Sequence, residues 1–273
     1  MTETRTGAAG GSAALQGRLW SDRAADWADI QQYFARPSWQ AVIDEQAPLA
    51  GRHVLDVGCG AGGFAELAAR AGARVSALDA APGLVEIAEQ RVPDGAFRVG
   101  EMEQLPYADD SFDLVTGFNS FQYAANPVTA LREARRVARP GGAVVAMIWG
   151  TAQECEPAAY LAALGALLPP PPPGAPGPFA LSRPGGLESL VSEAGLIAGE
   201  RRVVSCPWEF PDEATLVRGM LSAGPAARAV EHSGEAAARE AVLASCVPFR
   251  RTDGSYQLAC TFHHLTCRLP LGA

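Results

Sequence analysis

Short apolar runs alternate with amphipathic segments through the middle of the chain. Between residues 50 and 150, each apolar run has the length and residue types of a buried strand, and each segment between has apolar positions at three- and four-residue steps. The predicted strands span 53–58, 74–80, 96–102, 112–120 and 142–149. The predicted helices span 62–72, 82–92 and 126–139. This order predicts an α/β fold, a mostly parallel sheet with helices on both faces.

The pattern outside this region divides the rest of the chain. Residues 1–14 are expected to be a flexible leader, and 15–50 a helical arm or lid rich in tryptophan. Residues 51–150 are the predicted ligand-binding core, and 151–273 complete the same sheet domain and supply helices for a second pocket wall. Within that last part, 169–178 is proline-rich and is expected to be an extended connection.

Further elements are expected in the last hundred residues. A helix is predicted at 184–195, a strand at 200–208, a helical stretch at about 212–245 and a last strand at 256–269.

Composition and charge exclude several functions. A formal charge of −8 disfavours a nucleic-acid partner, and the longest apolar runs are too short to cross a bilayer. The six cysteines lack the C-x-x-C spacing of zinc sites, so no metal is predicted and reduced thiols in a cytoplasmic protein are expected.

The sequence "LDVGCGAGG" at residues 55–63 is the main candidate for ligand binding. It fits both the G-x-G-x-x-G of a dinucleotide site and the acid-x-G-x-G-x-G of a methyl-donor site. Its glycines are expected to leave backbone amides free to bind an anionic group of the ligand. Asp79 ends the next strand, where an acid binds both ribose hydroxyls of either ligand.

Three features favour the methyl donor. Asp56 would repel a pyrophosphate and suits an ammonium group instead. Glu101 can accept from an adenine amino group, and Met102 offers the ring an apolar surface. The third feature is the Pro-Gly-Gly turn in "RVARPGGAVV".

Five ordered motifs carry a family resemblance: "VLDVGCGAGG", "ALDAAPGLVEIA", "GEMEQLPYADDSFDLV", "NSFQYAANP" and "ARPGGAVV". Together they resemble the class I S-adenosylmethionine-dependent methyltransferases, and among these the small-molecule branch that includes the ubiquinone and menaquinone enzymes. The resemblance implies a Rossmann-like, seven-stranded sheet whose last strand is antiparallel. It also implies a methyltransferase of class EC 2.1.1.- with S-adenosylmethionine as cofactor.

The residues expected to bind the donor lie on the strand ends, the glycine turn and the arm. They are Asp56, Gly58, Cys59, Gly60, Asp79, Ala80, Glu101, Met102, Asn119, Trp27 and Tyr33. Asn119 is included because the resemblance places a donor-holding residue there. The two arm aromatics could contact the sulfonium through cation–π attraction; a helix merely fastened to the domain by its tryptophans is the alternative.

The acceptor is expected to be small and hydrophobic or aromatic. Trp149, Trp208 and Phe210 are the candidate walls of its pocket, because they lie at or just beyond strand ends. Methyl transfer needs no obligatory base. His232 is the candidate should one exist, and Gln122 and Tyr123 could polarise an acceptor.

Other functions remain open at this point. The fold could bind the donor only as a structural ligand, in a cyclase or a non-catalytic subunit, or it could be a nicotinamide-dependent oxidoreductase. The chain is expected to act as a monomer or homodimer without membrane or nucleic-acid partners. Its high alanine, glycine and arginine usage suits a GC-rich bacterial genome, where such enzymes often modify secondary metabolites.

Overall fold

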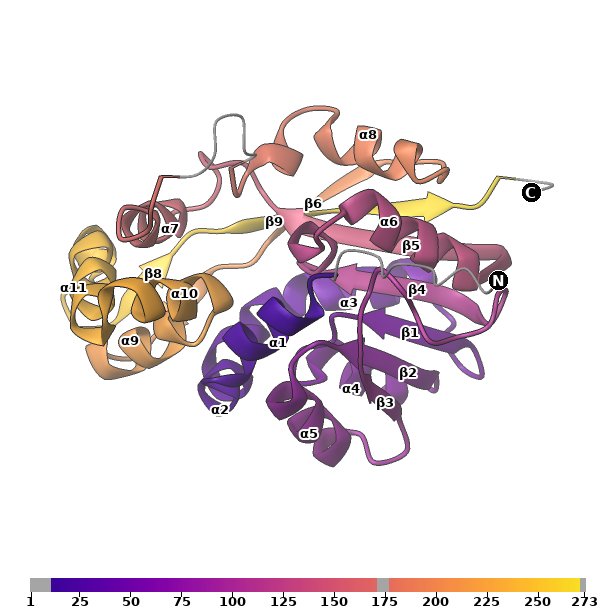
Figure 1. Ribbon diagram of the computed structural model, residues 1–273, viewed down its shortest axis with the longest axis horizontal. Helices are drawn as coiled ribbons and strands as arrows, with labels where there is room; N and C mark the ends of the chain where they lie inside the picture. The colour runs from indigo at the N-terminus through magenta and orange to yellow at the C-terminus, as the bar shows by residue number, and fades with distance from the viewer. Residues whose placement is uncertain (1–10, 171–176, 271–273) are drawn as a thin grey trace, which may run out of the picture.

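A seven-stranded mixed sheet forms the centre of the molecule (Figure 1). The computed structural model describes residues 11–170 and 177–270. Its strands are β1 (His53–Val57), β2 (Arg74–Asp79), β3 (Ala96–Val99), β4 (Phe112–Phe118), β5 (Ala138–Trp149), β6 (Arg201–Ser205) and β9 (Thr261–Arg268). They lie in the order β3-β2-β1-β4-β5-β9-β6, and β9 is antiparallel to both of its neighbours. The predicted fold class, including the antiparallel last strand, is confirmed.

Helices cover both faces of this sheet. Helices α3 (Arg36–Gln46) and α4 (Gly63–Arg70) pack on one face, with α5 (Pro82–Arg91) beside β2 and β3. Helices α6 (Pro127–Val137) and α8 (Gly186–Glu193) pack on the other. Successive residues of a buried strand belong to opposite cores: in β1, Val54 contacts the first group and Leu55 the second. This burial on both faces explains why the parallel strands are almost continuously apolar.

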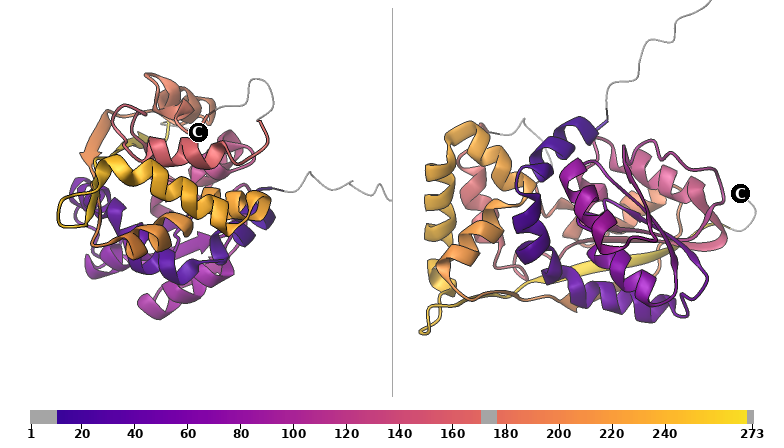
Figure 2. Two further views of the ribbon diagram at one scale, coloured as in Figure 1. Left: turned by 90° about the vertical axis from the view of Figure 1, so that its left-hand side faces the viewer. Right: turned by 90° about the horizontal axis from the view of Figure 1, so that it is seen from below.

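The arm is helical, as its periodicity predicts, but it changes helix type along its length. It contains α1 (Ala13–Ser21), α2 (Ala24–Asp26), the π-helix η1 (Trp27–Gln31) and the 3₁₀ helix η2 (Gln32–Ala35), and then continues into α3. Helix α1 begins inside the predicted leader, whose residues 1–10 lie outside the described part of the chain. In Figure 2 the indigo arm lies between the sheet domain and the C-terminal helices.

A second group of elements packs at the carboxyl end of the strands, and we call it the lobe. It consists of α7 (Ala158–Gly165), α9 (Glu213–Leu221), α10 (Gly224–Ser233), α11 (Glu235–Cys246), and the paired strands β7 (Trp208–Phe210) and β8 (Tyr256–Leu258). The predicted helical stretch at 212–245 is therefore three helices, divided at Gly224-Pro225 and at Gly234, which has φ +85°. Three short 3₁₀ turns connect the elements: η3 (Phe121–Tyr123), η4 (Ala180–Ser182) and η5 (Val247–Phe249).

The prediction of continuous strands at 200–208 and 256–269 is wrong in one respect. Each segment contributes one strand to the main sheet and one to the two-stranded sheet of the lobe. The first segment is interrupted at Pro207, which has no N–H to donate to a ladder. Just before it, the Cys206 N–H donates to the Cys260 carbonyl at 2.8 Å, so the two chains stay together where they leave the main sheet.

Three composition-based predictions can be compared with the described residues. The central part of the proline-rich connection, 171–176, lies outside them. No helix in the described ranges is long and apolar enough to cross a membrane. All six cysteines are buried free thiols, and no group of metal-ligating side chains occurs among the residues described.

Packing of α6 on the sheet gives a test of the fold. Leu131 is fully buried between α6 and the strands. Leu131→Ala is expected to lower the free energy of unfolding by about 2–5 kcal/mol, because it removes buried methyl groups and leaves a cavity. The same change at Leu15, which is 45% exposed on α1, should cost less than about 0.5 kcal/mol. Urea unfolding measures both; equal losses would contradict the packing described.

Candidate functional site

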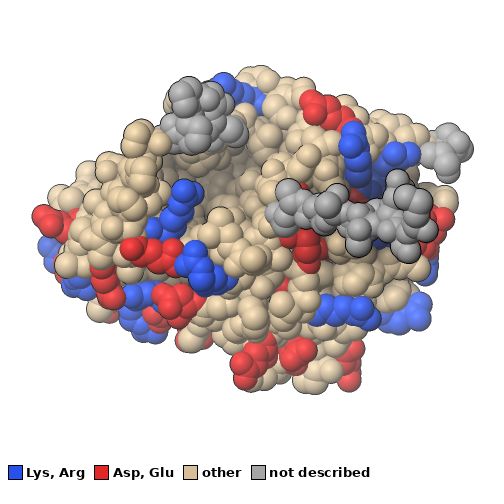
Figure 3. Space-filling view, in the orientation of Figure 1, with Lys and Arg blue, Asp and Glu red and all other residues tan. Residues whose placement is uncertain are grey.

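One pocket lies at the carboxyl edge of the sheet, where strand order reverses between β1 and β4. Three parts of the chain line it: the arm, the sheet edge (the ends of β1, β2, β4 and β5, the loop after β3 and the start of β9), and the lobe. Figure 3 shows the surface hollowed between the lobe and the sheet domain, with mostly uncharged residues around the hollow. The arm thus lines the pocket both beside the strand ends and beside the lobe.

Most of the residues predicted to bind the donor line this pocket. They are Asp56, Gly58, Cys59, Gly60, Asp79, Ala80, Glu101, Met102, Asn119 and Trp27. Tyr33 does not line it. Its ring lies 6.4 Å from that of Trp39 and under the Arg91 guanidinium, which is 5.4 Å from the ring centre.

The glycine turn after β1 is shaped by neighbouring protein groups. Gly58 and Gly60 have φ values of +72° and +55°, a region that favours glycine. A Cβ on Gly58 would lie 2.3 Å from the Cβ of Ser120, whereas a Cβ on Gly60 would meet only the indole nitrogen of Trp27, at 3.3 Å. Gly58 is therefore required by packing against the β4 loop, and Gly60 gives the pocket a bare stretch of backbone.

Three backbone amides of this turn already have partners inside the protein, contrary to expectation. The N–H groups of Gly58 and Cys59 donate to the Leu78 carbonyl at 2.7 and 3.1 Å, and the Gly60 N–H donates to Asp79 at 2.8 Å. The next glycine, Gly62, has φ +78°, and a Cβ there would lie 2.9 Å from Ala88 of α5. With three amides already bonded, the turn offers little to a pyrophosphate, which argues against a dinucleotide.

Two acids lie on either side of the turn, Asp56 buried and Asp79 half-buried. Asp79 accepts the N–H of Gly60 and, at 2.9 Å, that of Ala81. Burial raises the pKa of Asp79, and these backbone hydrogen bonds oppose the rise. Asp56 is 2% exposed and accepts a hydrogen bond from Thr116 at 2.8 Å. Burial raises the pKa of Asp56 to about 7, the Thr116 hydrogen bond opposes this, and the charge of Asp79 adds to it.

Glu101 lines the pocket but is engaged by the arm. Its carboxylate accepts the N–H of Ala13 at 2.7 Å, the hydroxyl of Ser12 at 3.4 Å and the N–H of Glu103 at 3.0 Å. The predicted adenine contact would have to share this carboxylate with three protein donors. Met102 lies beside it, 8% exposed, and belongs to the core cluster as well as to the pocket wall.

Asn119 sits at the end of β4 in the left-handed region, with φ +52°. Its N–H donates to the Met147 carbonyl at 3.0 Å, which fixes the backbone, while its side-chain oxygen is buried without a hydrogen-bond partner. The side-chain oxygen of Gln31, on the arm, is in the same condition. A buried oxygen without a donor costs about 1–3 kcal/mol, so both amides would gain from a ligand that carries N–H or O–H groups.

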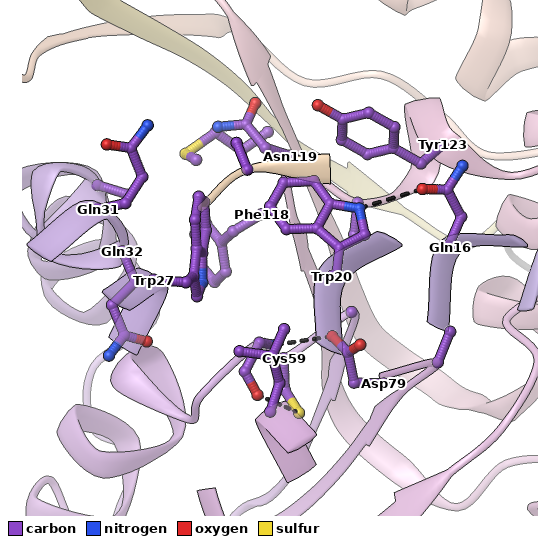
Figure 4. Close-up of a pocket in the computed structure, with 18 of the residues that line it drawn as sticks. Gln16, Trp20, Trp27, Gln31, Gln32, Cys59, Asp79, Phe118, Asn119 and Tyr123 are labelled. Atoms are coloured by element: carbon purple, nitrogen blue, oxygen red, sulfur yellow. Dashed lines mark hydrogen bonds between the residues drawn. The ribbon is translucent and has the colours of Figure 1, made fainter. Parts of the chain in front are cut away.

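The arm contributes two tryptophans that meet edge to face. Trp20 and Trp27 have ring centres 4.8 Å apart at 81°, and Trp20 lies 5.6 Å from Tyr123 at 75°. In Figure 4 the two indoles lie between Cys59 and Asp79 on one side and Asn119 and Tyr123 on the other. Trp20 was not among the predicted site residues, although its place in the arm's helical repeat was the available signal.

The side of the pocket predicted to bind the acceptor is aromatic. Trp149 and Trp208 line it, with ring centres 5.4 Å apart, and Trp208 stacks on Phe34 at 5.3 Å. Phe210, the third predicted wall residue, is not a lining residue. It packs behind Phe34 at 5.1 Å in the core of the lobe.

The structure separates the three candidate catalytic residues. Tyr123 lines the pocket, and burial raises its pKa while Gln122 and Trp149 oppose the shift through hydrogen bonds. Gln122 is a neighbour of Tyr123 and not a lining residue. His232 lies outside the pocket on the last turn of α10, where its Nδ1 is 2.9 Å from the Leu167 carbonyl.

Sequence reasoning missed further lining residues from all three parts of the chain: Ser12, Gln16, Trp20, Gln31, Gln32, Phe34, Ala35, Trp39, Phe64, Leu78, Leu84, Gly100, Phe118, Ser120, Met147, Tyr160, Leu161, Ala223, Pro225 and Phe262. Those of the arm share one side of a chain that passes through α-, π- and 3₁₀-helical turns. A regular 3.6-residue repeat does not predict such a side.

Comparison with known proteins agrees with this geometry. Residues 55–146 match the family described as "Methyltransferase domain". The demethylmenaquinone methyltransferase of Renibacterium salmoninarum is 40% identical over 104 residues, which are 38% of this chain and 44% of that protein. Residues 55–146 of this chain are thus similar to a methyltransferase domain.

A second relative and a solved structure are also similar to this chain. The ubiquinone biosynthesis O-methyltransferase of Xanthomonas oryzae pv. oryzae is 35% identical over 135 residues, 48% of this chain and 55% of that one. The chain thus spans about half the length of these relatives. The crystal structure of the cyclase SpnF covers 94% of both chains with a TM-score of 0.58 at 19% identity, which shows the shared fold alone.

The buried carboxyl of the methyltransferase domain gives a pH-dependent prediction. The native state holds Asp56 protonated up to a pKa of about 7, while the unfolded chain ionises near 3.8. The free energy of unfolding of the wild type should therefore fall relative to that of Asp56→Asn between about pH 4 and pH 7, by up to about 4 kcal/mol, and stay level above pH 7.

Urea unfolding at several pH values measures this difference. Asp94→Asn, at an exposed acid, is the control and should show no such dependence. A difference between wild type and Asp56→Asn that does not change with pH would contradict the buried, protonated state of Asp56.

Proposed function

We propose that this protein transfers the methyl group of S-adenosylmethionine to a small hydrophobic or aromatic acceptor. The observation that carries the proposal is the continuity of one pocket, which joins Asp56, Asp79 and the Gly60 turn to an aromatic cavity under the lobe. A donor at the sheet edge and an acceptor in the aromatic part would then meet without crossing solvent.

The residues at the donor end fit S-adenosylmethionine. Asp79 can bind the ribose hydroxyls, and Gly60 leaves room for the ligand against bare backbone. The side-chain oxygens of Asn119 and Gln31, buried without partners, can accept from the ammonium of its methionine part. Asp56 adds a carboxyl that such a cation would hold ionised. When bound, the donor supplies an electrophilic methyl on a positively charged sulfur.

The aromatic rings of the pocket favour the same ligand. Trp20, Trp27 and Tyr123 present π systems from the arm and the β4 loop, and a cation near such rings gains about 0.5–2 kcal/mol. Burial raises the pKa of Tyr123, so this side chain stays protonated at neutral pH and can donate a hydrogen bond to an acceptor oxygen.

The acceptor class follows from the other wall. The described lobe residues that line the pocket are Tyr160, Leu161, Trp208, Ala223 and Pro225, and none of them is charged. An ionic acceptor would lose its hydration there without gaining a counter-charge. A flat, apolar acceptor suits the stacked and tilted indole rings. We place the reaction in the cytoplasm and the chain among small-molecule enzymes of bacterial secondary metabolism.

The decisive experiment follows the labelled methyl group. The purified chain is incubated with methyl-labelled S-adenosylmethionine and cell extract, and both products are analysed by mass spectrometry. A labelled small molecule and S-adenosylhomocysteine in equal amounts are expected. Donor that stays bound without being consumed would instead favour a structural role in a cyclase or subunit. Binding of NADH in place of the donor would overturn the proposal.

Asp79 provides a test of donor binding. Asp79→Asn leaves one acceptor oxygen where the carboxylate offers two, and one of the two backbone bonds already occupies it. Its affinity for S-adenosylhomocysteine should fall by about tenfold or more, since charge-assisted hydrogen bonds are lost. Isothermal titration calorimetry measures this, and Asp94→Asn, which removes an exposed charge, is the matched control. Unchanged affinity would mean that Asp79 only supports the turn.

Trp208 tests the acceptor side independently. Trp208→Ala should raise KM for the acceptor found in the labelling experiment by about tenfold or more, because a buried indole supplies a large apolar contact area. The dissociation constant of S-adenosylhomocysteine should change less than about twofold. Trp208→Phe, which keeps a ring on Phe34, is the milder variant. Equal loss of donor and acceptor binding would contradict the division of the pocket.

A further inference from the structure

The start of the arm is held by acidic side chains from the loop after β3. Ser12 is the N-cap of α1, but its side chain caps none of the helix's own amides, and the first turn of α1 contains no acid. The Ala13 N–H donates instead to Glu101 at 2.7 Å, and the Ser12 N–H to Glu103 at 3.3 Å. Negative charge at this position stabilises a helix N-terminus. Glu101 and Glu103, from the loop after β3, therefore cap the start of α1.

The contact is close and specific. A Cβ on Gly11 would lie 2.2 Å from a Glu101 carboxylate oxygen, so the chain passes directly over this side chain. The Glu101 carboxylate is itself held by the Glu103 N–H, and Glu103 also accepts the Asn126 N–H at the start of α6. The loop after β3 is thus anchored before it receives the arm.

Helix α1 touches the site at two further points along its length. Gly17 lies on the end of β2, where a Cβ would be 2.3 Å from the Ala80 carbonyl oxygen. At its last turn, Trp20 lies against Gly224 of α10, where a Cβ would be 2.6 Å from the indole nitrogen. Helix α1 is thus attached to the loop after β3, to the end of β2 and to the lobe, and Glu101 supplies the first of these attachments.

We propose that Glu101 is a positioning residue that holds α1 closed over the donor end of the pocket, instead of binding the adenine of the donor. This inference rests on the proposed function, since it names what closes that site. It assigns the acid after β3 to the protein's own helix, and it predicts that losing the carboxylate loosens α1 even when no ligand is present.

Hydrogen exchange without ligand tests the first half of the inference. In Glu101→Gln the amides of residues 13–21 should exchange about fivefold faster than in the wild type, the size expected for loss of an N-cap interaction. Amides of α6 should not change. Glu89→Gln, at an exposed acid of α5, removes the same charge and should leave α1 unchanged. Unaltered exchange in α1 of Glu101→Gln would overturn the proposal.

A pair of ligands tests the second half. S-adenosylhomocysteine carries the 6-amino group that an adenine contact would need, and S-inosylhomocysteine lacks it. Glu101→Gln should raise the dissociation constants of both nucleosides by the same factor, about threefold to tenfold. The ratio of the two constants should therefore stay as in the wild type. A ratio that collapses toward one would show an adenine contact and overturn the inference.

The two failures are distinguishable. If neither nucleoside binds the wild type, the proposed function fails, while the exchange result still reports on the attachment of α1. Circular dichroism checks that each variant is folded. Should Glu101→Gln not fold, Glu101→Asp keeps the charge but shortens the reach by one methylene, and it should loosen α1 in the same way; unchanged exchange in that variant would equally overturn the proposal.

Discussion

The carboxylate of Asp79 is the constraint on which the rest of the site depends. It ends β2 and accepts the amides of Gly60, on the turn after β1, and of Ala81, just before α5. These two bonds fix the turn in its left-handed conformation and bring the ends of two strands to one place. Amides that already donate a hydrogen bond inside the protein are not available to a ligand. The turn therefore contributes shape and apolar surface more than hydrogen-bond donors.

From this fixed edge, the site is completed by close backbone approaches from distant segments. Gly58 admits Ser120 of the β4 loop, Gly17 brings α1 onto β2, and Gly219 and Gly224 admit Ile30 and Trp20 of the arm to the lobe. A side chain at any of these glycines would displace its neighbour. The arm therefore contacts both the sheet and the lobe, and this short helical segment lines the pocket between them.

Charge is distributed unevenly over the pocket. The acids Asp56, Asp79 and Glu101 lie at the sheet edge, and the described lobe residues that line the pocket carry no charge. A positively charged ligand group is stabilised at the acidic end and a neutral one in the aromatic end. This asymmetry is what the proposed reaction between a charged donor and a neutral acceptor would need.

Much of the methyltransferase core follows from the sequence because its signals are local. The apolar strands, the helices between them and the acid–glycine turn each depend on residues close together in the chain, and all were predicted at or near their observed positions. The resemblance added the antiparallel β9. The roles of single residues depend on geometry that the local pattern does not show. Tyr33 was predicted to line the pocket because it is an aromatic residue of the arm. The arm becomes π-helical at Trp27–Gln31, and other arm residues line the pocket instead.

The sequence by itself thus determined the sheet, the acid–glycine turn at its edge and the helical character of the arm. These features depend on hydrophobic periodicity and on turn-forming glycines, which involve residues close together in the chain. Only the tertiary structure decided which partner each polar group takes. Glu101 meets Ala13 across 88 positions, and the strands after Pro207 and before Thr261 leave the main sheet together to form the lobe. Such pairings depend on how distant segments pack against one another, and no local pattern encodes them.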